Sequence, residues 1–474
     1  MTPALLGTLY YASEWVIRLV MLVYVPQRRT AAATRTWLLF IFLLPWPGLV
    51  VYALFGRIRV SRRRFEKLAR ASRAIRQEEV RLLGERFVLG TVPHPYAPVA
   101  RLAFATGDFV PFAGNHLELL DDYAGWIARL IADIAGARGH VQLLFYIFEA
   151  DATGRSVADA VSRAAGRGVQ CRVLIDAIGG DRGLAHLGPR MEAAGAEVHA
   201  TRPMRWFRWN AGRADLRNHR KIAIIDGRVG HIGSQNIIDA DFSDGHPNVE
   251  LMARITGPVI TQLEAVFLTD WFLGTDERLD ARELIHDVAD TGTSTAQVLP
   301  SGPGYQSENT RDVVIALLYA ARESVVITTP YFIPDEPFLQ ALRTAATRGV
   351  RVRLVVSRHT DHLVSHFAQR AYYEDVLAAG VHIHLYRAGF LHAKHLSIDD
   401  EVAVVSTANI DIRSFALNAE VSLLVYDPAV VSDLARIQER YFANSDVLDA
   451  GEWSRRPLVA KVAQNVARLA DSLL

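Results

Sequence analysis

One short pattern of chemically active residues occurs twice in this sequence. The first copy runs from His219 through Lys221 to Asp226, and the second runs from His392 through Lys394 to Asp399. Both copies read His-x-Lys-x4-Asp, and a hydroxyl side chain and an amide side chain follow each: Ser234 and Asn236, then Thr407 and Asn409. The chain has four lysines against 48 arginines, and two of those four stand in the pattern. This usage indicates that the pattern needs an ammonium group rather than a guanidinium group.

Two imidazoles, two ammonium groups and two hydroxyl–amide pairs together suit a phosphodiester. Lysine and asparagine donors would hold the non-bridging oxygens and stabilise the charge that builds in the transition state. One histidine can attack phosphorus while the other protonates the leaving alkoxide. Symmetry of the motifs alone does not say which histidine attacks.

Two carboxylates are candidates for orienting the histidines. Asn248-Val249-Glu250 and Asn418-Ala419-Glu420 form a matched pair after the two motifs, and each could aim its carboxylate at the nearby histidine, Glu250 at His219 and Glu420 at His392. A carboxylate on the far ring nitrogen would fix the tautomer of each histidine and support its imidazolium form. The chain has one cysteine, and no acidic cluster of the kind that Mg²⁺ needs stands near either motif. We therefore predict neither a metal nor another cofactor, and we expect the lysines to take the role of a metal.

The elements around the motifs repeat as well. Each motif lies on a β-rich run, and a turn at Asp226-Gly227 or at Asp399-Asp400 predicts a hairpin. From about Leu117 helices and strands alternate, and the second half repeats their order. Matching letters, such as 164–169 with 345–350, support the repeat. The pattern predicts two similar α/β halves, residues 117–285 and 286–474, with one site between them.

The first 60 residues predict a membrane region, with spans at about 4–25 and 37–55. Glu14 and Arg18 can neutralise each other in the first span, and Pro45 and Pro47 should bend the second. A cleaved signal peptide is the alternative, but the start lacks a basic segment. Arginines from Arg57 to Arg64 place the following residues in the cytoplasm. We expect residues 61–116 to be a basic helical linker followed by an irregular segment.

The doubled motif resembles the phospholipase D superfamily, and most of the chain looks like the bacterial cardiolipin synthases within it. The supporting stretches are 37–39, 52–57, 330–334 and 409–414. The resemblance implies an α/β fold with two pseudo-symmetric phospholipase D-like halves, whose mixed sheets are flanked by helices, after N-terminal transmembrane helices. It implies transfer of a phosphatidyl group from one phosphatidylglycerol to another through a phosphohistidine at His219, with His392 as acid and base. Asp226 and Asp399 would support the site structurally. Ser406 departs from the family, which usually has glycine there.

Several alternatives stay open. A hydrolase of the same superfamily, either a phospholipase D or a nuclease, would use the same residues, although a net charge of +1 argues against nucleic acid. A membrane scaffold that only binds anionic lipid is the non-catalytic alternative. Trp206 and Trp209 could enter the membrane interface or lie on a loop packed on the body. His359, His362 and His366 have metal-like spacing, but without acidic or cysteine partners we expect a helical coincidence or a pocket rim. The apolar stripe of residues 458–474 should pack on the body. The oligomeric state is not indicated.

Overall fold

The computed structural model describes residues 2–28, 31–56, 90–201, 216–242, 245–280, 284, 288–302, 305, 308–360 and 363–468. The arginine-rich part of the linker and the stretch with Trp206 and Trp209 lie outside these residues, as does His362. The expected irregular segment is partly ordered secondary structure, because it contains η1 (His94–Tyr96), α5 (Ala97–Gly107) and β1 (Phe112–Leu120). β1 belongs to the same sheet as the strands of the first half, and it begins before residue 117.

Three apolar helices form the N-terminal region: α1 (Pro3–Tyr24), α2 (Ala31–Leu43) and α3 (Pro45–Phe55). Within the residues that the structure describes, α1 is the one helix long and apolar enough to cross a membrane. Glu14 and Arg18 form an ion pair of 3.4 Å in α1, as their spacing predicted. The second predicted span is not one helix, because the chain breaks at Leu44, before Pro45, and two short helices result.

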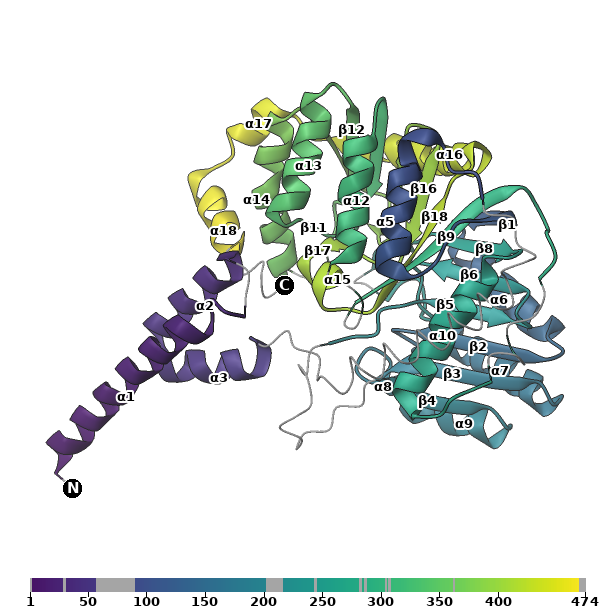
Figure 1. The fold of residues 1–474 in the computed structure, drawn as a ribbon, viewed down its shortest axis with the longest axis horizontal. Helices are drawn as coiled ribbons and strands as arrows, with labels where there is room; N and C mark the ends of the chain where they lie inside the picture. The colour runs from purple at the N-terminus through teal and green to yellow at the C-terminus, as the bar shows by residue number, and fades with distance from the viewer. Residues whose placement is uncertain are drawn as a thin grey trace.

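Fifteen strands of the described chain form one sheet, and its strand order is symmetric about the central pair of β1 and β9 (Ser294–Ser301). On one side of this pair the order is β1-β8-β6-β5-β2-β3-β4, and on the other it is β9-β18-β16-β15-β10-β12-β13, with β19 at the edge. The directions also match, since β2, β3 and β4 are parallel, as are β10, β12 and β13. The two halves thus join in one continuous sheet, and its strand order agrees with the predicted pseudo-two-fold relation (Figure 1).

The remaining bounds follow the predicted order closely. The first half contains β2 (His140–Phe145), β3 (Gln170–Asp176), β4 (Glu197–Thr201), β5 (Ile222–Ile225), β6 (Val229–Gly233), β7 (Asn248–Val249) and β8 (Met252–Thr256), with helices α6 (Tyr123–Gly136), α7 (Ala152–Gly166), α8 (Asp181–His186), α9 (Gly188–Ala193) and α10 (Ile260–Thr275). The strands of the second half are β10 (Ser324–Thr328), β11 (Phe332–Ile333), β12 (Arg351–Ser357), β13 (His382–Tyr386), β14 (Phe390–Leu391), β15 (His395–Ile398), β16 (Val402–Ser406), β17 (Ile410–Asp411), β18 (Glu420–Val425) and β19 (Ser445–Val447). Its helices are α12 (Asn309–Ala320), α13 (Glu336–Thr347), α14 (Leu363–Ala378), α15 (Ile412–Ala416), α16 (Pro428–Ala443), α17 (Ala450–Ser454) and α18 (Leu458–Arg468).

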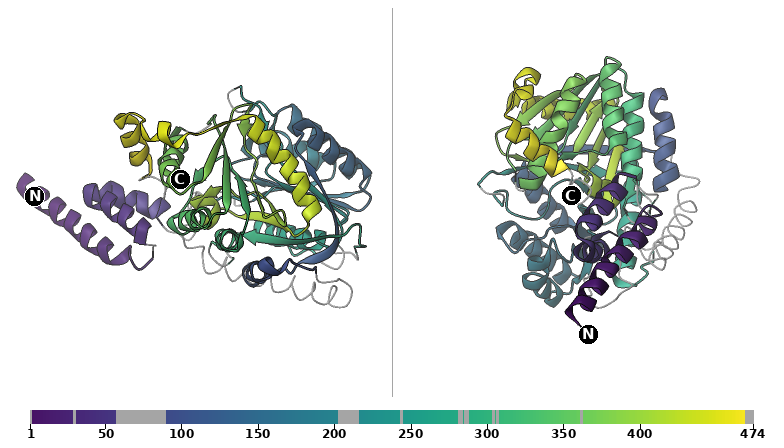
Figure 2. Two further views of the ribbon diagram at one scale, coloured as in Figure 1. Left: turned by 90° about the horizontal axis from the view of Figure 1, so that it is seen from above. Right: turned by 90° about the vertical axis from the view of Figure 1, so that its left-hand side faces the viewer.

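Helices cover both faces of the sheet, and apolar side chains fill the layers between them. One face of the first half packs against α6, α7 and α9, and the corresponding face of the second half packs against α12, α13 and α14. The other face carries α10 and α16, whose apolar residues join a core that is common to both halves. Figure 2 shows these layers from two further directions. Because one core spans the sheet, the two halves are held in a fixed relation.

Candidate active site

The two motif histidines each bond a glutamate of the opposite half. His219 Nδ1 lies 3.0 Å from Glu420 Oε2, and His392 Nδ1 lies 2.6 Å from Glu250 Oε1. Both glutamates are buried, while the His219 and His392 side chains keep 11% and 15% exposure. Each half therefore supplies the histidine of one pair and the carboxylate of the other. The expectation that each glutamate serves the nearby histidine is wrong, because the segments before the two histidines cross to the opposite half.

Backbone pairing between the halves produces this exchange. The His219 N–H donates to the Ala419 carbonyl at 2.9 Å, and the His392 N–H donates to the Val249 carbonyl at 2.8 Å. β14, just before His392, pairs in parallel with β7 of the first half. His219 and Lys221 consequently precede β5 rather than lying within it. The predicted strand begins at Ile222 because the segment before it pairs with the other half.

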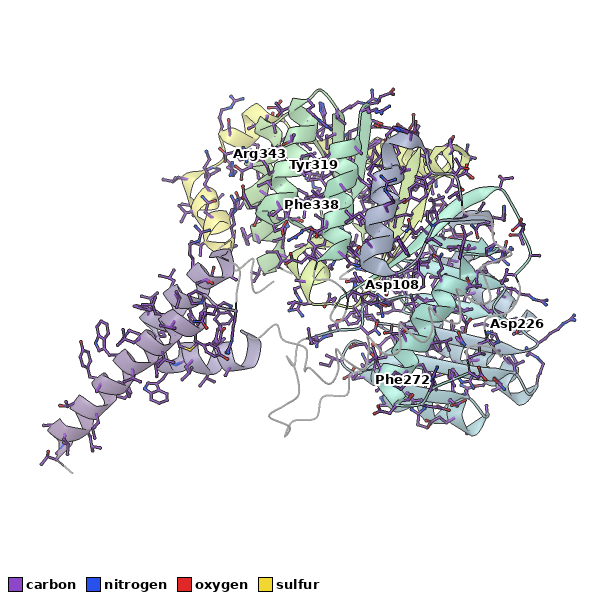
Figure 3. All side chains as sticks on the ribbon, viewed as in Figure 1. Asp108, Asp226, Phe272, Tyr319, Phe338 and Arg343 are labelled. Carbon is purple, nitrogen blue, oxygen red and sulfur yellow. The ribbon has the colours of Figure 1, made fainter. Side chains whose placement is uncertain are left out.

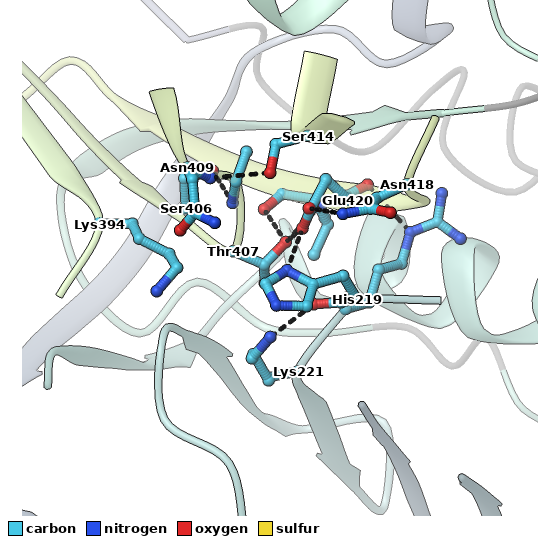
Figure 4. Close-up of polar contacts among 12 residues, drawn as sticks. His219, Lys221, Lys394, Ser406, Thr407, Asn409, Ser414, Asn418 and Glu420 are labelled. Carbon is cyan, nitrogen blue, oxygen red and sulfur yellow. Dashed lines mark hydrogen bonds and ion pairs between the residues drawn. The ribbon is translucent and has the colours of Figure 1, made fainter. Parts of the chain in front are cut away.

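Glu420 is held by several neighbours besides His219, as Figure 4 shows. The Thr407 hydroxyl donates to Glu420 Oε2 at 2.6 Å, and the Asn418 amide donates to Oε1 at 3.4 Å. The Thr407 Oγ1 also accepts from the Val421 N–H at 3.0 Å. In this structure the hydroxyl of Thr407 orients the carboxylate, and its predicted contact with a phosphate stays a prediction.

The two glutamates differ in their electrostatics. Burial raises the pKa of Glu420 to about 7, although Lys221 opposes the shift. Burial also acts on Glu250, but the charges of His392 and Lys394 outweigh it and lower the pKa of Glu250. Glu250 is therefore the carboxylate that stays ionised at neutral pH.

The histidines differ in the corresponding way. Burial and the nearby Lys221, Lys394 and His392 hold the pKa of His219 well below its usual range. Burial lowers the pKa of His392 too, but there Glu250 acts against the shift. The charge of His392 is among the causes of the shift at His219, which indicates that the two rings lie near each other. This difference favours His219 as a neutral nucleophile and His392 as an imidazolium acid, and both roles stay predictions.

Each motif lysine bonds the backbone of its own histidine. Lys221 Nζ donates to the His219 carbonyl at 2.8 Å, and Lys394 Nζ donates to the His392 carbonyl at 2.6 Å. Burial lowers the pKa of Lys221 to about 7, and the positive charge of Lys394 adds to this effect. An anionic substrate between the two ammonium groups would relieve their repulsion.

The hydroxyl–amide clusters lie at the ends of the returning strands. Asn236 accepts a hydrogen bond from the Ile147 N–H at 3.1 Å through Oδ1, which turns its amide nitrogen away from that bond. Asn409 lies among the residues lining a small pocket that also contains Lys394. The Ser234 hydroxyl bonds both backbone groups of Leu251. Phosphate contacts by Ser234, Asn236 and Asn409 stay predictions.

Ser406 is accommodated by a partner that the first half does not have. A side chain added at Gly233, the equivalent position, would come within 2.2 Å of the Leu251 carbonyl. In the second half Ser406 Oγ instead lies 2.8 Å from Ser422 Oγ and accepts from the Ala408 N–H at 2.9 Å. Serine therefore fits at this position in the second half, and its hydroxyl accepts a hydrogen bond from a backbone N–H group there.

The motif aspartates bind backbone at the far end of each hairpin strand. The Asp226 carboxylate accepts from the N–H groups of residues 138–140, and Asp399 accepts from those of residues 322–324 and from the Tyr96 hydroxyl. Seven residues of extended chain, roughly 20 Å, separate Asp226 from His219. Figure 3 shows Asp226 at the outer edge of the first half. These contacts indicate a supporting role, as the resemblance implied, rather than a reacting one.

An Asp226→Asn variant is expected to unfold at a lower temperature at pH 7, with a loss of about 1–2 kcal/mol, because charged hydrogen bonds are weakened. Burial alone would raise the pKa of Asp226, but its three backbone donors outweigh burial and lower it. A lowered folded-state pKa contributes stability above the usual aspartate pKa of about 4, and that stability is lost as the pH falls. Thermal unfolding at pH 7 and pH 3 should show the difference from wild type shrinking in acid. The exposed Asp241→Asn variant is the control, and an equal change in both variants would contradict the assignment.

Two buried polar groups that the sequence analysis did not single out hold the first motif in place. The Arg220 guanidinium donates to the carbonyls of Glu420 and Ser301, each at 3.0 Å, and pairs with Asp270 of α10. The Asp176 carboxylate accepts from the Asn218 N–H at 2.8 Å. Arg220 has Ala393 as its counterpart in the second motif. That difference was the available signal, but nothing in the sequence shows that Arg220 crosses to the other half.

Both halves of the chain match the same family of known proteins. A family model described as "Cardiolipin synthase, PLD-like domain" matches residues 130–271 and 314–442, and "Phospholipase_D-nuclease N-terminal" matches residues 15–57. The chain is 35% identical to cardiolipin synthase A of Yersinia pseudotuberculosis (serotype O:1b, strain IP 31758) and of Yersinia pestis (bv. Antiqua, strain Angola), over 94% of each chain. The solved phosphatidylserine synthase of Haemophilus influenzae Rd KW20 is 15% identical, with a TM-score of 0.61, and the match covers 80% of this chain and 100% of that one. That likeness concerns the fold alone.

Proposed function

This chain belongs to the cardiolipin synthase family of phospholipase D-like proteins, and we propose that it is a membrane-bound phosphatidyltransferase that makes cardiolipin from two phosphatidylglycerol molecules and releases glycerol. The observation that carries the proposal is the crossed arrangement of His219 with Glu420 and of His392 with Glu250. It supports a site in which one histidine attacks phosphorus while the other moves the proton.

In the first step His219 attacks the phosphorus of one phosphatidylglycerol. Its Nδ1 faces Glu420, so Nε2 is the attacking atom. The N–P bond forms as the bond between phosphorus and the glycerol headgroup oxygen breaks, and His392 gives its proton to that oxygen. Lys221 and Lys394 stabilise the negative charge of the phosphoryl oxygens.

In the second step His392 has lost its proton and acts as the base. It takes the proton from a headgroup hydroxyl of a second phosphatidylglycerol, and that oxygen attacks phosphorus. The N–P bond breaks, His219 becomes neutral again and His392 regains its charge. Glu250, ionised beside His392, supports the charged form in both steps.

We place the protein in the inner membrane, because α1 supplies an apolar helix long enough to cross a bilayer and the proposed substrate is a membrane lipid. The arginines from Arg57 to Arg64 favour a cytoplasmic catalytic region. A second crossing would require α2 and α3 to act together.

Purified full-length protein in vesicles containing phosphatidylglycerol with labelled headgroups is expected to yield cardiolipin and free labelled glycerol in equal amounts. A His219→Ala variant should yield neither product. Adding unlabelled phosphatidylethanolamine tests the alternative donor, since ethanolamine would then be released. Phosphatidic acid in place of cardiolipin would contradict transfer and support the hydrolase.

A further inference from the structure

The last described helix exposes its apolar face and buries its polar one. In α18, Leu458, Val459, Val462 and Val466 are 75%, 81%, 54% and 60% exposed, whereas Gln464 is 3% exposed. The expectation that this stripe packs on the body is therefore wrong for the described residues. A helix in water normally turns its apolar face inward, so this orientation indicates a partner outside the body.

Specific polar contacts fix the helix in this orientation. Arg468 pairs with Asp375 of α14 at 3.1 Å, and its guanidinium lies 4.3 Å from the centre of the Tyr372 ring. Arg456 donates to Gln464 at 2.8 Å and pairs with Glu374 of α14, also at 2.8 Å. Since these contacts hold the polar face against α14, the apolar face must point away from the body.

The neighbouring helix adds to the exposed apolar surface. The N-terminal end of α14 carries Leu363, Val364 and Phe367, which are 72%, 51% and 38% exposed. Scattered apolar residues are common on protein surfaces, but stripes on two packed helices are not.

Position and charge indicate what covers this surface. α18 lies beside the N-terminal helices in all three views, and α1 among them exposes apolar side chains along its length (Figures 1 and 2). Residues 453–468 contain four basic residues and no acidic residue: Arg455, Arg456, Lys461 and Arg468. Arg456 and Arg468 pair with carboxylates of α14, so Arg455 and Lys461 are the two that can meet anionic headgroups. An apolar helix face with basic residues at its borders suits an interface of anionic phospholipids.

We propose that the apolar face of α18 enters the same membrane surface as the N-terminal helices and forms a second contact between the catalytic body and the bilayer. A helix of this kind lies in the plane of the interface with its apolar face about 5–10 Å into the headgroup and acyl boundary. With this second contact beside the N-terminal helices, the catalytic halves would keep a fixed orientation to their lipid.

Site-specific fluorescence tests the contact without depending on turnover. The chain has one cysteine, Cys171, which is 1% exposed, and burial raises the pKa of its thiol to about 11, so it reacts poorly with labels. Val462→Cys and Leu458→Cys variants of the full chain carry an environment-sensitive dye in vesicles of phosphatidylglycerol and phosphatidylcholine. Asp433→Cys, on the distant α16, is the matched exposed control.

Nitroxide groups placed near the lipid headgroups are expected to quench the dye at positions 458 and 462 at least about twofold more than at position 433, as for a helix lying in the interface. Omitting phosphatidylglycerol should reduce the quenching at 458 and 462. Equal quenching at all three positions would overturn the proposal. So would crosslinking of Val462→Cys between two chains without lipid quenching, because a second copy would then cover the face.

Discussion

A His392→Ala variant that is given a phosphatidyl ester of p-nitrophenol is expected to release one burst of nitrophenol and then stop. Nitrophenolate leaves without needing a proton, so His219 can still attack phosphorus in the absence of the acid. The second step still requires a base to activate the incoming alcohol. The phosphatidyl group should therefore remain on the protein, where mass spectrometry of peptides would locate it on His219.

A His219→Ala variant should give no burst with the same ester, and its rate should fall by about 10⁴-fold or more because the nucleophile is missing. His231→Gln is the matched control, since His231 is also buried and bonds a carboxylate, Asp133, at 2.9 Å outside the site. A burst in the His219 variant with none in the His392 variant would reverse the two roles. The electrostatic difference between the rings would then not decide which one attacks.

The second large effect concerns the exchanged glutamates. A Glu250→Gln variant is expected to lose about 10²-fold or more in cardiolipin synthesis, because an amide does not support the imidazolium form of His392. Although Glu250 belongs to the first half, its variant should behave like the His392 variant. With the nitrophenyl ester it should keep a fast burst and show slow turnover.

A Glu420→Gln variant should instead slow the burst itself, because Glu420 orients the His219 ring. Glu264→Gln, a change at a buried glutamate of α10, is the control for removing a buried charge elsewhere. If each glutamate variant behaved like the histidine variant of its own half, the crossed pairing would not operate in catalysis. Burst amplitude and steady-state rate, measured together, separate the two outcomes.

The sequence by itself determined the chemistry and the repeat. Two of the four lysines stand at a fixed spacing from a histidine and identified both motifs, because this spacing can be read from the sequence without knowledge of the fold. Strand and helix order in both halves followed from apolar periodicity. The Asp-Gly and Asp-Asp turns close hairpins, as predicted, and the structure gives both residues of each turn a positive φ. Glu250 and Glu420 could be proposed as histidine partners because they form a matched pair of carboxylates.

Only the tertiary structure decided which residues of one half meet those of the other. Which glutamate serves which histidine depends on backbone pairing between segments about 200 residues apart, such as His219 with Ala419, and no local pattern encodes it. The hydrogen bonds of Arg220 across the halves and the outward orientation of the apolar face of α18 likewise have no local pattern that encodes them. Periodicity shows that a helix has an apolar face, but the surface it contacts depends on long-range packing and on what lies outside the chain.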